Sequence, residues 1–318
     1  MQPMTHNHTR ETSIFYNEHS TECTNCQAPF SNGMCTHLGY LKDGSCAVLC
    51  DTCSHLLKET IVRYHWMEKE YASPLPDDKL WRYMDLSKFI SLVSSKTLFF
   101  ASADSFDDPF EGAKGIDSRK GKWDEFYLEF FREAIKTVPE IDPSTLTETD
   151  IEKDAQRLLR EMSESGKLAK QHTYISCWHH NEQESEAMWR LYSKDVTNAV
   201  AIQTTANNLY LSLDREPTID IGKVKYIDFE KRFSSVNGAF WYKRKSFEHE
   251  REVRAILQSY EAPCAGHAIP VDINVLINGV YISPYAPKWF ADVVQSVVDK
   301  YAVRKPVYQS RMLLTPFF

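Results

Sequence analysis

The sequence contains no apolar run that approaches the roughly 18 residues needed to cross a membrane, and its polar first residues include no apolar signal core. We therefore expect a cytoplasmic protein with no membrane partner. The chain also lacks a basic excess, because 37 lysine and arginine residues stand against 44 aspartate and glutamate residues, for a net charge of −7. This charge argues against a general nucleic-acid binder, although a local basic patch can still bind nucleic acid.

Several common catalytic motifs are absent as well. The chain contains no G-x-x-x-x-G-K-S/T, G-x-G-x-x-G, G-x-S-x-G or H-E-x-x-H sequence. These absences argue against the P-loop, Rossmann, hydrolase and zinc-protease frameworks that such motifs mark. With 318 residues and 42% hydrophobic composition, the chain has the size of about two globular domains, or of one large domain with an appendage.

What the chain does have is a cluster of cysteines. Six of its eight cysteines lie between residues 23 and 53, and four of them form two C-x2-C pairs: Cys23, Cys26, Cys50 and Cys53. In a reducing compartment such clusters bind metal more often than they form disulfides. Two C-x2-C pairs supply the four thiolates of a tetrahedral Zn²⁺ site. We therefore predict a structural zinc ion held by these four residues.

The segment between the two pairs contains turn residues, and a helix is predicted to start near Cys53. A turn that carries the first C-x2-C pair, a hairpin, and a helix that carries the second pair together form a treble-clef-like arrangement. A closed four-cysteine site leaves no open position for catalysis, so the predicted zinc is structural. Four nearby residues are alternative ligands: Cys35, His37, Cys46 and His55.

Composition divides the chain into three parts. Residues 1–22 form a polar tail, residues 23–72 form the zinc module and a helix, and residues 79–318 form a larger domain beyond a proline-rich linker. Few of the strands expected in this domain alternate with long helices, so a doubly wound parallel sheet is not expected. We predict an α+β fold with a curved, mainly antiparallel sheet and a helical insertion.

The insertion is predicted from two amphipathic patterns. Aromatic and aliphatic residues recur at helical spacing from Trp123 to Ile135, and a second helix is expected from a capping box at Thr149 to about Gly166. We interpret the aromatic stripe of the first helix as buried core rather than as a cofactor site.

Several motifs in the larger domain resemble a bacterial family, domain of unknown function number 2971. The most specific is Ser-Phe-Asp-Asp-Pro-Phe-Glu at residues 105–111, and others lie at residues 80–84, 175–192, 247–254 and 280–286. The family commonly has Asn where this chain has Asp107. The resemblance covers residues 80 to about 310 and implies a domain without implying an activity.

A looser resemblance, to ADP-ribosyltransferases, implies a chemistry. The order of a strand with Arg82 and Tyr83, a second strand, a helical insertion and a late Glu250-x-Glu252 is similar to that of these enzymes, which have a split antiparallel sheet. The resemblance implies that Glu252 is catalytic and that Glu250 is the first glutamate of the pair. NAD would be the substrate, and the role implied is that of a toxin or an antiphage effector that modifies a protein or nucleic-acid target.

Further residues receive roles in this NAD hypothesis. The guanidinium of Arg82 would pair with pyrophosphate or ribose oxygens. Three aromatic residues are candidates to stack on nicotinamide: Tyr83, Phe100 and Trp178. A fixed carboxylate would stabilise the oxocarbenium character that develops when the bond between nicotinamide and ribose breaks.

Three other interpretations remain open. The glutamates of residues 248–254 can form a structural ion-pair lattice with Arg254, Arg82 or Arg244. A metal-dependent nuclease could use four carboxylates: Asp107, Asp108, Glu111 and Glu250. A non-enzymatic protein could bind a nucleotide as a sensor or adaptor. The basic stretch at residues 241–245 is interpreted as a solvated turn, with a nucleic-acid contact as the alternative.

Overall fold

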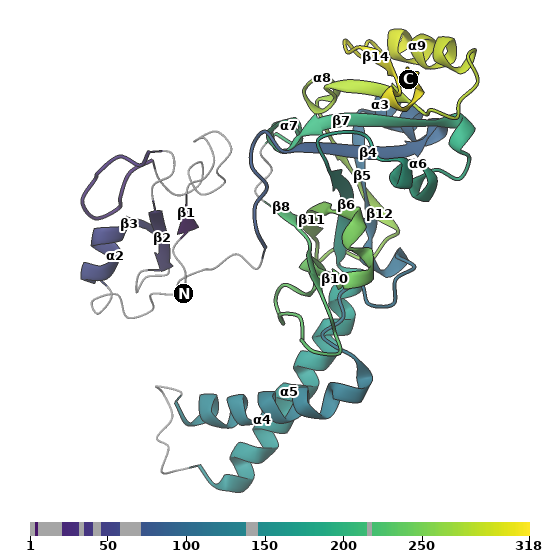
Figure 1. The fold of residues 1–318 in the computed structure, drawn as a ribbon. Helices are drawn as coiled ribbons and strands as arrows, with labels where there is room; N and C mark the ends of the chain where they lie inside the picture. Colours follow the sequence, from purple (N-terminus) through teal and green to yellow (C-terminus); the bar gives the residue numbers. More distant parts are fainter. Residues whose placement is uncertain are drawn as a thin grey trace.

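The computed structural model describes residues 4–5, 21–31, 35–40, 46–57, 71–137, 146–214 and 218–318, and it combines helices with mainly antiparallel sheet (Figure 1). Its N-terminal part contains a small antiparallel sheet in the order β1-β2-β3. The elements of this part are β1 (Met4–Thr5), β2 (Cys35–Tyr40), β3 (Cys46–Cys50) and α2 (Asp51–Leu57). The predicted hairpin and following helix are therefore present, whereas residues 58–70 of that predicted helix lie outside the described residues.

The larger part is built on a nine-stranded sheet. Its strands are β4 (Lys79–Asp85), β5 (Thr97–Ser102), β6 (Thr173–His180), β7 (Ala199–Thr205), β8 (Ile219–Lys223), β11 (Glu252–Gln258), β12 (Gly266–Pro270), β13 (Gly279–Ile282) and β14 (Val307–Gln309). Only β13 and β14 pair in parallel among these strands, so the predicted mainly antiparallel sheet is confirmed. A separate two-stranded parallel sheet joins β9 (Lys225–Ile227) to β10 (Tyr242–Arg244).

Strand β6 is the branch point of the large sheet. One of its edges pairs with β11 from Thr173 to His179. The other edge pairs with β5 at Tyr174 and Ile175 and with β4 at His179 and His180, so residues 176–178 have no ladder partner on that side. Figure 1 shows the consequence, because β4 and β7 run across the direction of β5, β6 and β11. The sheet is therefore split along one side of β6.

Helices on one face of the sheet close the main core. Helix α3 (Leu86–Ser95) places Phe89, Leu92 and Val93 inward, at spacings of three and four residues. The left-handed backbone of Lys96 (φ 54°) ends the helix. The other helices that contribute to this core are α7 (Ala206–Ser212), α8 (Ile273–Leu276) and α9 (Phe290–Lys300). Helix α6 (Glu186–Tyr192) covers Trp81 and Tyr83 on the opposite face of β4.

The linker region contacts the larger part of the chain. The main chain of Ala72 accepts a hydrogen bond from the amide of Lys223 at 2.8 Å. The ring of Tyr71 is buried and lies 4.1 Å from the ring of Trp241, centroid to centroid. These two residues, which the predicted division assigned to the zinc module, therefore pack against the sheet domain.

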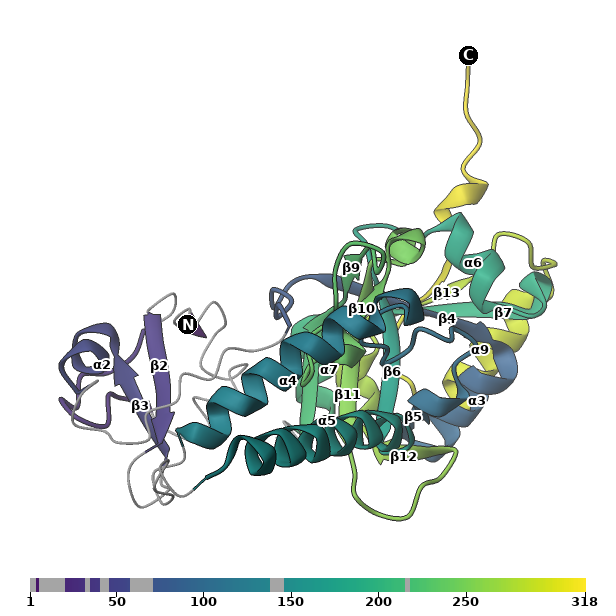
Figure 2. The same cartoon turned by 90° about the horizontal axis from the view of Figure 1, so that it is seen from below.

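The predicted helical insertion is a two-helix hairpin that extends away from the sheet (Figures 1 and 2). It consists of α4 (Lys120–Lys136) and α5 (Glu148–Gln171), and α5 runs past Gly166, where we had expected its end. The expectation of a buried aromatic stripe is wrong, since no residue of α4 is buried and Phe126 and Phe130 are 64% and 55% exposed. Helix α5, the partner of α4 in the hairpin, buries only Ile151, Ala155 and Leu159 of its own, and one packed neighbour cannot enclose so wide a stripe.

Candidate functional site

A cavity of about 480 Å³ lies where β4 and β5 diverge from β6. Its volume is in the range of cavities that hold small ligands or parts of cofactors. Its wall is formed by side chains of these three strands, of α3 and α6, and of the turn before β11. Most residues proposed for a nucleotide site line it, namely Arg82, Tyr83, Trp178, Glu250 and Glu252.

Phe100 is not among the lining residues. Its side chain is fully buried in the main core, against the helices. Successive strand residues point to opposite faces, so the neighbouring Phe99, which is 49% exposed, lines the cavity instead. The stacking role proposed for Phe100 therefore has no support in its position.

The proposed residues reach the cavity from two faces of β6. Arg82 donates a hydrogen bond to the hydroxyl of Ser176, and its guanidinium lies 5.6 Å from the ring of Trp178. Glu252 pairs across the ladder with His179, so it projects from the opposite face. The cavity thus has a basic end and an acidic end, joined where β6 has no ladder partner.

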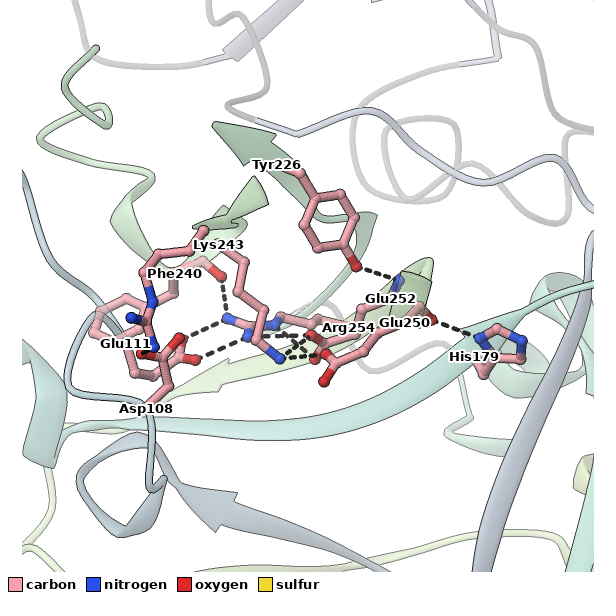
Figure 3. Close-up of polar contacts among 10 residues, drawn as sticks. Asp108, Glu111, His179, Tyr226, Phe240, Lys243, Glu250, Glu252 and Arg254 are labelled. Atoms are coloured by element: carbon pink, nitrogen blue, oxygen red, sulfur yellow. Dashed lines mark hydrogen bonds and ion pairs between the residues drawn. The ribbon is translucent and has the colours of Figure 1, made fainter. Parts of the chain in front are cut away.

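Five buried charged side chains form a network behind the acidic end (Figure 3). Arg254 lies at its centre and donates to both oxygens of Glu111, at 2.5 and 2.9 Å, and to Glu252, at 2.8 and 3.3 Å. The ammonium of Lys243 donates to Glu250 and, at 3.2 Å, to Glu252. Three carboxylates against two cations leave this network with one net negative charge.

The two glutamates of the predicted pair differ in their surroundings. Burial alone would raise the pKa of Glu252, but the charges of Arg254 and Lys243 outweigh it and lower this pKa to about 2. Glu250 is bound by Lys243 alone among the described cations. It also lies outside β11, because Arg251 adopts a left-handed conformation (φ 43°) that ends the preceding 3-10 helix, Lys245–Glu250. Glu250 is therefore the less constrained carboxylate.

The basic end contains two cations that form no ion pair with a carboxylate of the described residues. No carboxylate of the described residues forms an ion pair with Arg82 or with Lys88, which is exposed on α3 and also lines the cavity. Burial lowers the pKa of Arg82, which reflects the cost of holding a charge in a partly buried place. A bound anion would offset that cost.

Tyr83 has a defined structural role. Its hydroxyl accepts a hydrogen bond from the amide of Ser185 at 2.7 Å, and its ring packs edge-on against Trp189. Burial raises the pKa of this phenol, so it stays neutral. The contact positions the start of α6 beside the acidic end of the cavity.

Two residues of the acidic end, Lys243 and His179, were not predicted from the sequence. Lys243 was placed in a solvated turn, but its side chain is buried against Glu250 and Glu252, and the adjacent Trp241 is buried as well. His179, to which the sequence assigned no role in the cavity, lies in β6, lines the cavity and bonds the main-chain oxygen of Glu250 at 2.6 Å. Five lysine and arginine residues in the run from residue 243 to 254, spaced among three glutamates, were the only sequence signal for a buried network.

The carboxylates proposed for a nuclease are not gathered around a common point. Both oxygens of Glu111 are occupied by Arg254, and Asp108 accepts a bond of 2.7 Å from Arg244. Asp107 is exposed. In the part of the chain that the structure describes, the four clustered cysteines are the one group with the spacing of a metal site.

Those cysteines are Cys23, Cys26, Cys50 and Cys53, whose sulfur atoms all lie within 4.8 Å of one another. The Sγ atoms of Cys26 and Cys50 are 3.8 Å apart, which matches the roughly 3.8 Å edge of a tetrahedron with 2.3 Å metal–sulfur bonds. Backbone amides of Cys26 and Cys50 outweigh the effect of burial and lower the pKa of Cys23 to about 6. The four residues could hold a metal ion, whereas the side chains of Cys35, His37, Cys46 and His55 lie outside the described residues.

Comparison with known proteins adds no family. No protein-family model matches the chain, and no curated protein matches it. Among the helices of the described residues, none is both long and apolar enough to cross a membrane. Function must therefore be inferred from the cavity and the cysteine cluster themselves.

Proposed function

We propose that the cavity at the split in the sheet binds NAD and that the protein is an ADP-ribosyltransferase-like enzyme. The observation that carries this proposal is the charge pattern of one apolar cavity, with Arg82 and Lys88 at one end and Glu250 and Glu252 at the other. NAD has the complementary pattern, since its nicotinamide ring is cationic and its pyrophosphate is anionic. Aromatic side chains between the two ends offer surfaces for a planar ring.

In this proposal the basic end binds the pyrophosphate. The guanidinium of Arg82 is anchored by Ser176 and by Trp178, so it can offer its remaining N–H groups to phosphate oxygens without first being ordered. Lys88 would add a second positive charge. Because neither cation has a described carboxylate partner, an anionic ligand need not displace an existing ion pair.

The acidic end would act on the bond between nicotinamide N1 and ribose C1′. When this bond breaks, its electron pair moves to the nitrogen and neutralises the ring, while C1′ gains oxocarbenium character. A carboxylate fixed nearby stabilises that cation before a nucleophile of the target, or water, bonds to C1′. We assign this role to Glu250, which has one described cationic partner, and a positioning role to Glu252, which is held by two.

A titration of the full chain with NAD, followed by chromatography for free nicotinamide, tests this function. We expect binding and nicotinamide release by the wild type. Arg82→Met should weaken NAD binding roughly ten- to hundredfold, because a charge-assisted bond is lost, while the matched change Arg160→Met on exposed α5 should not. No binding by the wild type would contradict the proposal, and binding without release would favour the nucleotide-sensing alternative.

We further propose that the four cysteines hold one structural zinc ion in a treble-clef-like module. The convergence of four sulfur atoms at a tetrahedral spacing supports this. Such a site would leave no position open for a substrate, so the zinc would contribute to folding of the module rather than to the reaction.

Metal analysis of the purified protein tests the zinc proposal. We expect about one zinc per chain in the wild type. Cys50→Ser should lower that content and make the N-terminal module sensitive to protease, whereas Cys264→Ser, at an exposed cysteine outside the cluster, should leave one zinc bound. Native protein without zinc, or a Cys50→Ser variant that retains it fully, would contradict the assignment.

A further inference from the structure

The imidazole of His179 carries a buried nitrogen without a hydrogen-bond partner. Its side chain is 93% buried, because its exposed fraction is 7%. The Nδ1 atom bonds the main-chain oxygen of Glu250 at 2.6 Å, while Nε2 has no partner among the described residues. A buried polar atom left unpaired costs free energy, and most buried polar atoms of folded proteins have a partner.

The geometry defines the chemical character of this nitrogen. A carbonyl oxygen only accepts hydrogen bonds, so Nδ1 must carry the proton that it donates to Glu250. Burial lowers the pKa of His179, with a further contribution from the cation of Arg251, so the ring is neutral near pH 7. Nε2 is then a lone-pair acceptor, on the edge of the ring away from Glu250 (Figure 3).

His179 lies at the acidic end of the cavity. His179 is the ladder partner of Glu252 and lies beside Tyr83, with ring centroids 6.3 Å apart. Its ring lines the same cavity as Glu250. An amide ligand in this end could therefore meet a carboxylate and a neutral nitrogen acceptor.

We infer that His179 is a positioning residue whose Nε2 accepts a hydrogen bond from the N–H of a ligand's carboxamide. This inference rests on the proposed function, in which nicotinamide occupies the acidic end. The bond would orient the ring, and through Nδ1 the same imidazole would hold the main chain of Glu250. Recognition of the leaving group and placement of the carboxylate would thus depend on one side chain.

Two ligands and two variants distinguish the proposed bond of Nε2 to the ligand from the bond of Nδ1 to Glu250. Nicotinamide has a carboxamide N–H, whereas 3-acetylpyridine has a methyl group in its place and keeps the carbonyl. His179→Asn keeps a donor at the position of Nδ1 but removes the acceptor. His179→Gln keeps an acceptor near the position of Nε2 but loses the bond to Glu250.

The inference is tested by measuring the affinity of both pyridines for the full-length wild type and for each variant. Thermal melts of the same proteins are measured in parallel. We expect the wild type to prefer nicotinamide roughly three- to tenfold, as one neutral hydrogen bond allows. His179→Asn should lose the preference with little change in melting temperature, and His179→Gln should retain part of it but melt earlier. Equal affinities in the wild type, no binding of either compound, or a preference that survives in His179→Asn would overturn the inference.

Failure of the proposed function and failure of the role of His179 give different results. If the wild type shows the preference for nicotinamide and His179→Asn loses it, the role of His179 stands even when NAD itself does not bind, and only the proposed function fails. If NAD binds and releases nicotinamide but the preference is absent, the proposed function stands and the role of His179 is overturned.

Discussion

Replacing Glu252 by Gln is expected to lower the free energy of unfolding by about 3 kcal/mol at pH 7. The buried carboxylate, which is 4% exposed, holds both Arg254 and Lys243, and its removal leaves those cations with one fewer counter-charge. A fall in pKa from 4.5 to about 2 on folding corresponds to a similar free energy, about 3 kcal/mol. Urea denaturation of wild type and variant measures the difference.

The same difference should depend on pH with a defined sign. Because the folded-state pKa of Glu252 lies below the unfolded-state value, its contribution is complete above about pH 4.5 and declines as the pH falls toward 2. About 2 of the 3 kcal/mol should be lost by pH 3. The control Glu161→Gln, at an exposed site on α5, should track the wild type throughout. A Glu252→Gln variant as stable as the wild type at pH 7 would show that the network is not structural.

Replacing Glu250 by Gln should reduce nicotinamide release by about a hundred- to thousandfold. The change preserves the size of the side chain but removes the negative charge assigned to the oxocarbenium-like state, and loss of a preorganised electrostatic contact typically has this effect. Stability should fall less than in Glu252→Gln, because Lys243 keeps its bond to Glu252. Initial rates at saturating NAD, measured beside thermal melts, provide the comparison.

Glu248→Gln is the matched control for that experiment. Glu248 belongs to the same 3-10 helix as Glu250 but is exposed, so its replacement should leave the rate unchanged. Equal rates for the wild type and Glu250→Gln would remove Glu250 from the reaction. A larger loss of rate in Glu252→Gln than in Glu250→Gln, at equal folded fractions, would return the catalytic role to Glu252.

Local sequence patterns were sufficient to predict much of the sheet domain. The strand with Arg82 and Tyr83, the second strand and the helical insertion form in the predicted order, because short apolar runs bounded by polar residues mark the two strands and helical spacing marks the insertion. The prediction that the aromatic stripe on α4 is buried was wrong, because helical periodicity indicates an apolar face but does not show that another element covers it.

The sequence allowed the carboxylates of the site to be predicted, but it did not reveal most of the residues that pair with them. The two-residue spacing of Glu252 and Arg254 places both on one face of a strand, which the sequence shows directly. Glu111 reaches Arg254 from 143 residues away, a pairing that only the packing of the loop after β5 creates. The side-chain direction of Lys243 likewise depends on β9 and β10, a short sheet that its sequence does not reveal.

A crystal structure of the full chain grown with NAD would show whether the cavity at the split of the sheet is an NAD site. We expect the dinucleotide in this cavity, with its pyrophosphate at Arg82 and its nicotinamide at Glu250 and His179. Zinc should be bound by the four cysteines in the same crystals. An unoccupied cavity at saturating NAD, or NAD bound elsewhere on the chain, would contradict the proposed NAD site.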